Sequence, residues 1–225
     1  MPSSPTWPEV PRNACVVIPV GSFEQHGPHL PLDTDTQIAA HLCTTAAHGI
    51  NSVVIAPPLS ITASGEHAGF PGTMSIGTEA LTTVIVELVR SCDWAMGVIL
   101  VHGHGGNLAA VQRATTLLHS EQRNIASWWP QIQGADAHAG HTETSLMLAI
   151  NPQSVRLEKL DIGNVQPMSE LQHDLQTQGV KAVSENGILG NASTATAEHG
   201  DEILTALTND LRSFIHTTYE QWTIA

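Results

Sequence analysis

The chain has 225 residues, enough for one sizeable α/β domain, and 8 Lys and Arg against 21 Asp and Glu give it a formal net charge of −13. That acidity excludes nucleic-acid backbones and anionic membrane surfaces as expected partners. No shift in composition and no repeat divides the sequence, so residues 1–225 are expected to form a single domain.

In chain order, the hydrophobic pattern predicts strands that alternate with helices. Short apolar runs predict strands at 15–20, 52–56, 97–101 and 125–129. Apolar residues at helical spacing predict helices at 36–48, 78–92, 107–122, 143–150 and 201–219. Strands and helices that alternate in this way predict an α/β fold, in which helices sandwich a mostly parallel central sheet. Ligands of such sheets bind beyond the carboxyl ends of the strands.

The cysteines and the hydropathy pattern indicate where the protein resides. The three cysteines are widely separated and form no CxxC pair, which is typical of thiols in a reducing compartment. The sequence shows neither the pattern of a signal peptide nor an apolar run of membrane-spanning length. We therefore expect a cytoplasmic protein.

The first motif directly follows the first predicted strand and combines carboxylates with imidazoles. Glu24 and His26 are two residues apart, so an extended backbone points both side chains to one face. Asp35 follows nine residues after His26, across a turn rich in Pro and Gly. Mixed carboxylate and imidazole ligands suit zinc, iron or manganese. The segment predicts half of a metal site, because no structural need explains so many of these groups in twelve residues.

The second motif, His-Gly-His-Gly-Gly-Asn at 102–107, lies between a predicted strand and a helix. Its position also suits a phosphate cradle, but the Lys-Ser/Thr pair of a P-loop is missing. Glycines on both sides leave His104 unhindered, which makes it the better metal ligand. His102 is equally explained by hydrogen bonds to loop carbonyls.

The third motif contains His138 and Glu143 and precedes an apolar helical run. A carboxylate in the first turn of a helix can cap free amides, and it can also reach a metal across the strand ends. His138 lies five residues upstream, which suits proton transfer. A lone histidine is usually structural, but His104 and Glu143 together with the first motif favour a metal site.

Two further segments offer candidate substrate contacts. Glu66 and His67 could line the pocket, although a polar pair that caps a Gly/Pro-rich turn explains them as well. Trp128 and Trp129 could wall a pocket or pack in the core. Glu66, His67 and Trp129 are our candidates for substrate binding.

Residues 21–35, 103–107, 138–145 and 187–200 resemble the motifs of the creatininase family of amidohydrolases. The resemblance implies a three-layer αβα sandwich, a homohexamer and two divalent metal ions, Zn²⁺, Fe²⁺ or Mn²⁺, that support hydrolysis of a C–N bond. The positions that match the family's metal ligands are Glu24, His26, Asp35, which would bridge the ions, and His104.

The chain departs from the family at a few positions. Creatininase has a glutamate two residues after the loop histidine, where this chain has Gly106. We assign the missing carboxylate to Glu143, as a direct ligand or as a group that orients water or a ligand imidazole. His138 matches the family's catalytic histidine and would protonate the leaving nitrogen. His102 and residues 191–192 differ from the usual Asn and Asp-Pro.

Within the family, the first motif and residues 63–73 are most similar to a peptidase that removes a C-terminal Val-Tyr dipeptide from a modified ribosomal peptide. A small amide, such as creatinine or a formamide, is the alternative substrate, and a small pocket walled by tryptophans would favour it. A non-catalytic, metal-binding hexameric scaffold is the alternative of another class.

Overall fold

A computed structural model describes residues 5–224. Its centre is a parallel sheet in the order β2-β1-β3-β4, which confirms the predicted α/β fold. The strands are β1 (Cys15–Val20), β2 (Val53–Ile55), β3 (Gly97–His102) and β4 (Ile125–Trp128). All residues of β1 and β3 are buried, as expected for the central strands of a sheet covered on both faces.

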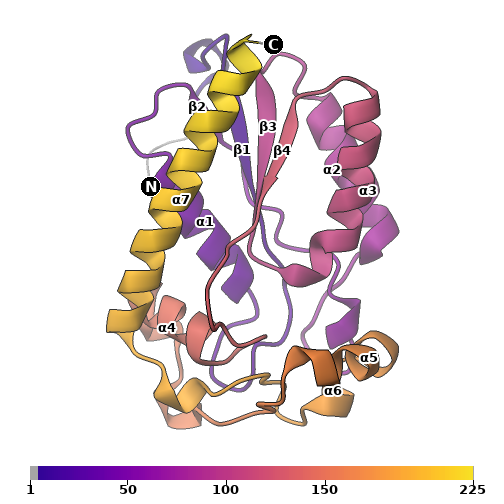
Figure 1. The fold of residues 1–225 in the computed structure, drawn as a ribbon, viewed down its shortest axis with the longest axis vertical. Helices are drawn as coiled ribbons and strands as arrows, with labels where there is room; N and C mark the ends of the chain where they lie inside the picture. Colours follow the sequence, from indigo (N-terminus) through magenta and orange to yellow (C-terminus); the bar gives the residue numbers. More distant parts are fainter. Residues whose placement is uncertain (1–4, 225) are drawn as a thin grey trace.

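Helices cover both faces of the sheet (Figure 1). One face carries α1 (Thr34–Ala46), α4 (His141–Ile150) and α7 (Ala197–Ile224), and the other carries α2 (Gly77–Arg90) and α3 (Leu108–Ser120). Two short helices, α5 (Met168–Gln178) and α6 (Val180–Val183), lie together at the lower end of the molecule in Figure 1. The three layers that the family resemblance implies are therefore present.

The alternation of side chains along β1 builds two separate cores. Val17 joins the cluster of α1, α4 and α7, whereas Val16 and Ile18 join the cluster of α2 and α3. Because apolar side chains leave both faces of β1, the strand must lie between two helical layers.

The predicted helices are found, but their boundaries differ from the structure by a few residues. α1 begins at Thr34 instead of residue 36, so Asp35 lies in its first turn. α7 begins at Ala197 instead of residue 201. The sequence analysis did not predict α5, whose apolar residues are only Met168, Leu171 and Leu175 among polar ones and of which only Leu171 is buried. Among residues 5–224, no helix is both long and apolar enough to cross a membrane.

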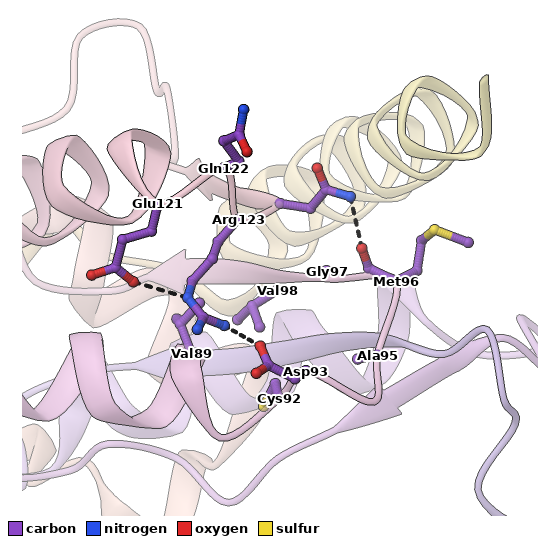
Figure 2. A pocket seen from close by; sticks show the side chains of 11 residues that line it. Val89, Cys92, Asp93, Ala95, Met96, Gly97, Val98, Glu121, Gln122 and Arg123 are labelled. Carbon is purple, nitrogen blue, oxygen red and sulfur yellow. Dashed lines mark hydrogen bonds and ion pairs between the residues drawn. The ribbon is translucent and has the colours of Figure 1, made fainter. Parts of the chain in front are cut away.

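A cavity of about 320 Å³ lies at the amino ends of β3 and β4 (Figure 2). Its Arg123 is already paired with the carboxylates of Asp93 and Glu121. The residues of all three motifs lie at the other ends of the strands, where parallel sheets bind their ligands. The candidate site therefore lies at the carboxyl ends of the strands.

Candidate metal centre

The loop after β1 and the first turn of α1 bring the first motif together. Glu24, His26 and Asp35 are all buried. The backbone carbonyl of Asp35 lies so close to Gly103 that a Cβ at position 103 would approach it to 2.4 Å. The glycine therefore allows the loop after β3 to reach α1, which places His104 beside Asp35.

Asp35 belongs to two groups of possible metal ligands. In the first group, His104 Nδ1 lies 3.1 Å from Glu24 Oε1 and 3.3 Å from Asp35 Oδ2. In the second group, His26 Nε2 lies 3.0 Å from Asp35 Oδ1 and 3.8 Å from Glu143 Oε2. Each of the two Asp35 oxygens thus faces a different group.

Backbone carbonyls fix the orientation of both imidazoles. His26 Nδ1 lies 3.0 Å from the carbonyl oxygen of Glu24, and His104 Nε2 lies 3.1 Å from that of Ala63. Because a carbonyl oxygen can only accept, each of these ring nitrogens carries the proton and donates it. The other nitrogens, His26 Nε2 and His104 Nδ1, then face the carboxylates with free lone pairs, as metal ligands require.

The buried carboxylates of the cluster attract positive charge, which a divalent cation would supply. Both carboxylate oxygens of Glu24 are buried and have no hydrogen-bond partner among the described residues. Burial opposes protonation of His26, but the charges of Asp35, Glu143 and Glu24 outweigh it and raise its pKa to about 10. The oxygen and nitrogen donors suit a borderline divalent metal. The residues present therefore fit the metal that the motifs predict.

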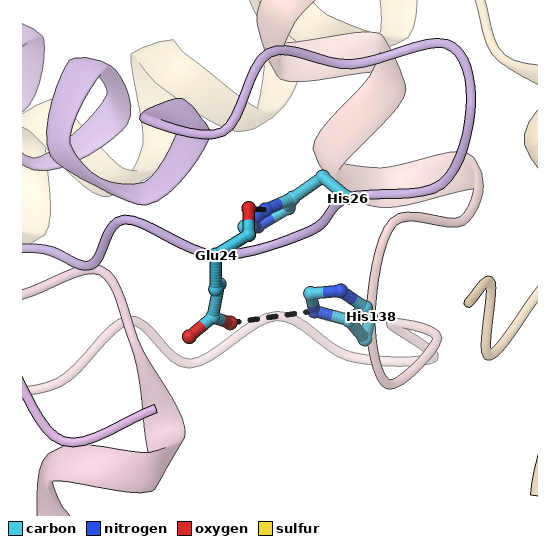
Figure 3. A group of neighbouring side chains, drawn as sticks. All are labelled: Glu24, His26 and His138. Carbon is cyan, nitrogen blue, oxygen red and sulfur yellow. Dashed lines mark hydrogen bonds and ion pairs between the residues drawn. The ribbon is translucent and has the colours of Figure 1, made fainter. Parts of the chain in front are cut away.

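His138 lies beside Glu24 and His26, one member of each group (Figure 3). Its Nε2 donates to the backbone carbonyl of Gln25 at 2.8 Å, so Nδ1 is left as an acceptor. That Nδ1 lies 3.9 Å from Glu24 Oε1 and 4.0 Å from Glu143 Oε2. Burial, together with the charges of neighbouring imidazoles, holds the pKa of His138 well below its usual value. A neutral His138 can accept a proton or bind a metal.

Glu143 lies in the first turn of α4, where its carboxylate can both cap a backbone amide and face the metal cluster. Its Oε2 accepts a hydrogen bond from the backbone amide of Ala139 at 2.6 Å, as a capping carboxylate does. The same carboxylate belongs to the group of His26 and Asp35. Burial is the main cause that raises the pKa of Glu143, to about 7. Its assignment as a ligand stays a prediction.

The structure places His67 inside the cluster and Glu66 behind it. His67 Nε2 lies 3.2 Å from Glu24 Oε1, and His67 itself is buried. Glu66 Oε1 lies 3.3 Å from His104 Nε2, on the side of the ring that faces away from Asp35. Glu66 can therefore orient the imidazole of His104 through its protonated nitrogen.

The two tryptophans lie in the hydrophobic layers. Trp129 stacks on the ring of His102, with 3.8 Å between the ring centroids, and packs against the cluster of α2 and α3. Trp128 is buried, and its indole nitrogen donates to Asp210 Oδ2. Neither tryptophan belongs to the groups of possible metal ligands among the described residues. A contact between Trp129 and the substrate stays a prediction.

Two residues that we did not single out in the sequence support the cluster. The Gln25 side-chain amide donates to His67 Nδ1 at 2.9 Å and to the carbonyl of Gly187 at 3.0 Å. Ser22 Oγ donates to Asp35 Oδ2 at 2.8 Å. Both residues lie within two positions of Glu24. The density of polar residues directly after a buried strand is the sequence feature that could have identified them.

Replacing Gly106 with alanine is expected to weaken metal binding by about 10- to 100-fold. A Cβ at position 106 would lie 2.1 Å from Glu66 Oε1 and 2.3 Å from His104 Nε2, so the imidazole must shift. The control is Gly105→Ala, because a Cβ at Gly105 would meet nothing within 4 Å. Metal titration would compare the affinities of the two variants. Equal affinities of Gly105→Ala and Gly106→Ala would contradict the expectation.

Replacing His102 with phenylalanine is expected to raise the free energy of unfolding by about 1 kcal/mol. His102 is fully buried, and neither ring nitrogen has a hydrogen-bond partner in the described part of the chain. Phenylalanine keeps the stack on Trp129 and removes both unpaired atoms. Denaturant unfolding would measure the change. The comparison variant is His119→Phe, which loses a bond to the Ile125 carbonyl and should gain nothing.

Comparisons with known proteins identify the family of the chain. The family model described as creatinine amidohydrolase matches residues 3–215. The mycofactocin precursor peptide peptidase of Mycolicibacterium smegmatis is 50% identical over 201 residues, with 86% of this chain and 81% of that protein covered. The peptidase of the same name from Mycobacterium tuberculosis is 47% identical over 206 residues, covering 87% and 82%. The creatinine amidohydrolase of Pseudomonas putida is 28% identical over 235 residues, covering 88% and 89%.

Solved structures of creatininase share the fold. A zinc form of a creatininase variant and a manganese form of creatininase each superpose with a TM-score of 0.75 at 23% identity. Each comparison covers 92% of this chain and 91% of the other. In this chain, the buried groups of Glu, Asp and His described above could hold a metal ion. The family model covers nearly the whole sequence, and the chain belongs to the creatininase family.

Proposed function

We propose that this protein is a metal-dependent peptidase that cleaves a peptide bond of the mycofactocin precursor peptide. The observation that carries the proposal is the 50% identity to a mycofactocin precursor peptide peptidase over 86% of this chain. Hydrolysis of a C–N bond is the chemistry of the family, and the cluster around Asp35 provides groups suited to it. The Val-Tyr dipeptide that the family resemblance implies as the product stays a prediction.

We further propose that the cluster holds two divalent ions. Glu24, Asp35 and His104 would hold one, and His26, Asp35 and Glu143 the other. When bound, such ions supply Lewis acidity, which polarises the scissile carbonyl and lowers the pKa of a water molecule. Zn²⁺, Fe²⁺ and Mn²⁺ all suit these oxygen and nitrogen donors.

His138, which lies beside the proposed ligands, would carry out the proton transfers. His138 is neutral and points Nδ1 into the cluster, so it can accept a proton from water and return it to the leaving nitrogen. Without that proton, the nitrogen would have to leave as an anion. The bond to the Gln25 carbonyl holds the His138 ring in place while its Nδ1 changes protonation.

The surroundings of the cluster favour a peptide over creatinine. Glu66 and Gly106, which adjoin His104, also line a cavity of about 950 Å³. That volume admits a chain of several residues. None of the described residues that line it is a tryptophan, and Trp129 is engaged with His102. A small pocket walled by tryptophans, the feature expected of a creatinine site, is not found at this cavity.

The test is mass spectrometry of a synthetic peptide ending in Val-Tyr. Metal-loaded protein is expected to release the dipeptide, and EDTA-treated protein is expected not to. Creatinine and a formamide serve as parallel substrates. Hydrolysis of either one without cleavage of the peptide would favour the alternative amidohydrolase, and no hydrolysis of any substrate would favour a non-catalytic scaffold. The homohexamer that the resemblance implies stays a prediction, and light scattering can test it.

A further inference from the structure

The cavity beside His104 is built by segments that are distant in the sequence. Its wall comprises the turn at Gly65–His67, the beginning of α3 and the two short helices α5 and α6. Glu66 belongs both to this wall and to the surroundings of His104. The cavity therefore lies beside His104, on the side of the ring that Glu66 occupies.

Close backbone packing holds α6 against this turn. A Cβ at Gly179 would lie 2.7 Å from the backbone carbonyl oxygen of Glu66, and the backbone φ there is +80°. Lys181, two residues later, packs its aliphatic chain against Gly69. Its ammonium nitrogen lies 3.2 Å from the Gly69 carbonyl oxygen and 5.4 Å from the centre of the Phe70 ring. These contacts place the lysine at the wall of the cavity.

Lys181 is the one cationic side chain among the described residues that line the cavity. Three basic side chains elsewhere in the fold, Arg90, Arg113 and Arg123, contact carboxylates. Lys181 contacts no carboxylate among residues 5–224, and an ammonium group has two donors left after one bond to a carbonyl. Lys181 is thus a cation at the cavity wall with donors available to an anionic group.

We propose that this cavity binds the carboxyl-terminal residues of the peptide and that Lys181 pairs with the terminal carboxylate. The proposal rests on the peptidase function proposed above and names a residue that determines specificity. The apolar side chains of Leu108, Met168 and Leu175 line the same cavity and suit the apolar surface of a terminal dipeptide. The terminal carboxylate would then select the cleavage position by its distance from the metal centre.

A charge-assisted bond between an ammonium and a carboxylate predicts discrimination against a neutral peptide end of about 10- to 100-fold. The experiment compares two peptides of the same sequence, one with a free carboxylate and one with a terminal amide. For the unaltered protein, the ratio of kcat/KM for the acid to that for the amide is expected to be about 10 to 100. The ratio should fall to about 1 in Lys181→Gln and largely survive in Lys181→Arg, which keeps the charge.

The matched control is Lys159→Gln, because Lys159 is equally exposed and lies outside the cavity wall. This variant should keep the ratio of the unaltered protein. Equal cleavage of the acid and the amide by the unaltered protein would overturn the role of Lys181 and leave the peptidase function standing.

A binding measurement separates the two proposals if no peptide is cleaved. Calorimetry with the free dipeptide Val-Tyr and its amide reports on the cavity without any hydrolysis. Tighter binding of the acid by about 10- to 100-fold, lost in Lys181→Gln, would support the carboxylate site even if the proposed reaction fails. Equal affinity for the acid and the amide would overturn it.

Discussion

Replacing Asp35 with asparagine is expected to remove most of the bound metal and to lower kcat/KM by roughly 10³-fold or more. Asp35 is the shared member of both ligand groups, and each of its oxygens faces a different imidazole. Asparagine has nearly the same size and can still accept the hydrogen bond of Ser22. The substitution therefore removes the charge while the loop keeps its support. Metal analysis of the purified variant and peptide cleavage would measure both effects.

The matched control for this prediction is Asp33→Asn. Asp33 lies two residues before Asp35 and directly precedes α1. Its carboxylate accepts a hydrogen bond from the side chain of Gln37, outside the metal cluster. This variant should keep its metal and its rate. Full metal content in Asp35→Asn would show that the carboxylate does not bind metal, and the two-ion proposal would then have to be abandoned.

Replacing His138 with alanine is expected to leave the metal content unchanged and to lower amide hydrolysis by about 10²- to 10⁴-fold. His138 offers a neutral Nδ1 about 4 Å from Glu143 and Glu24, where it can exchange protons with reacting groups. The loss should be much smaller for a peptide ester with a nitrophenolate leaving group, because that group departs without a proton. Comparison of the two substrates therefore isolates the proton transfer.

His216→Ala is the control, since His216 is exposed on α7 and its ring pairs with Glu220. It should behave like the unaltered protein with both substrates. A loss of metal in His138→Ala would instead identify His138 as a ligand with Glu24 and His26, the third group that the geometry allows. An equal loss with the amide and the ester would contradict the role as a proton donor.

Several features of the fold and the site follow from local sequence. The apolar runs of β1 and β3 predicted buried strands, because a parallel sheet between two helical layers needs apolar side chains on both faces. The two-residue spacing of Glu24 and His26 indicated a shared face, and both side chains are buried in one cluster. The glycines around His104 indicated an unhindered imidazole at a strand end, which is where it lies.

Other features depend on contacts between distant segments. α5 buries only Leu171, and its apolar stripe of Met168, Leu171 and Leu175 is too sparse among polar residues to mark a helix clearly. The sequence offered Glu66 as a substrate contact, but only the tertiary structure places its carboxylate beside His104 Nε2. The missing Cβ of Gly106 leaves the space for this contact. Trp129 was offered as a pocket wall, and the fold stacks it on His102.

The sequence by itself determined the type of fold, the family and the kinds of groups in the metal site, because local periodicity and short motifs encode them. The tertiary structure decided which oxygen of Asp35 faces which imidazole and that Lys181 stands at the cavity next to His104. The pairs Asp35 and His104, and His104 and Lys181, come from segments that are distant in the sequence. They follow from the packing of helices and loops around the sheet, which no local pattern records.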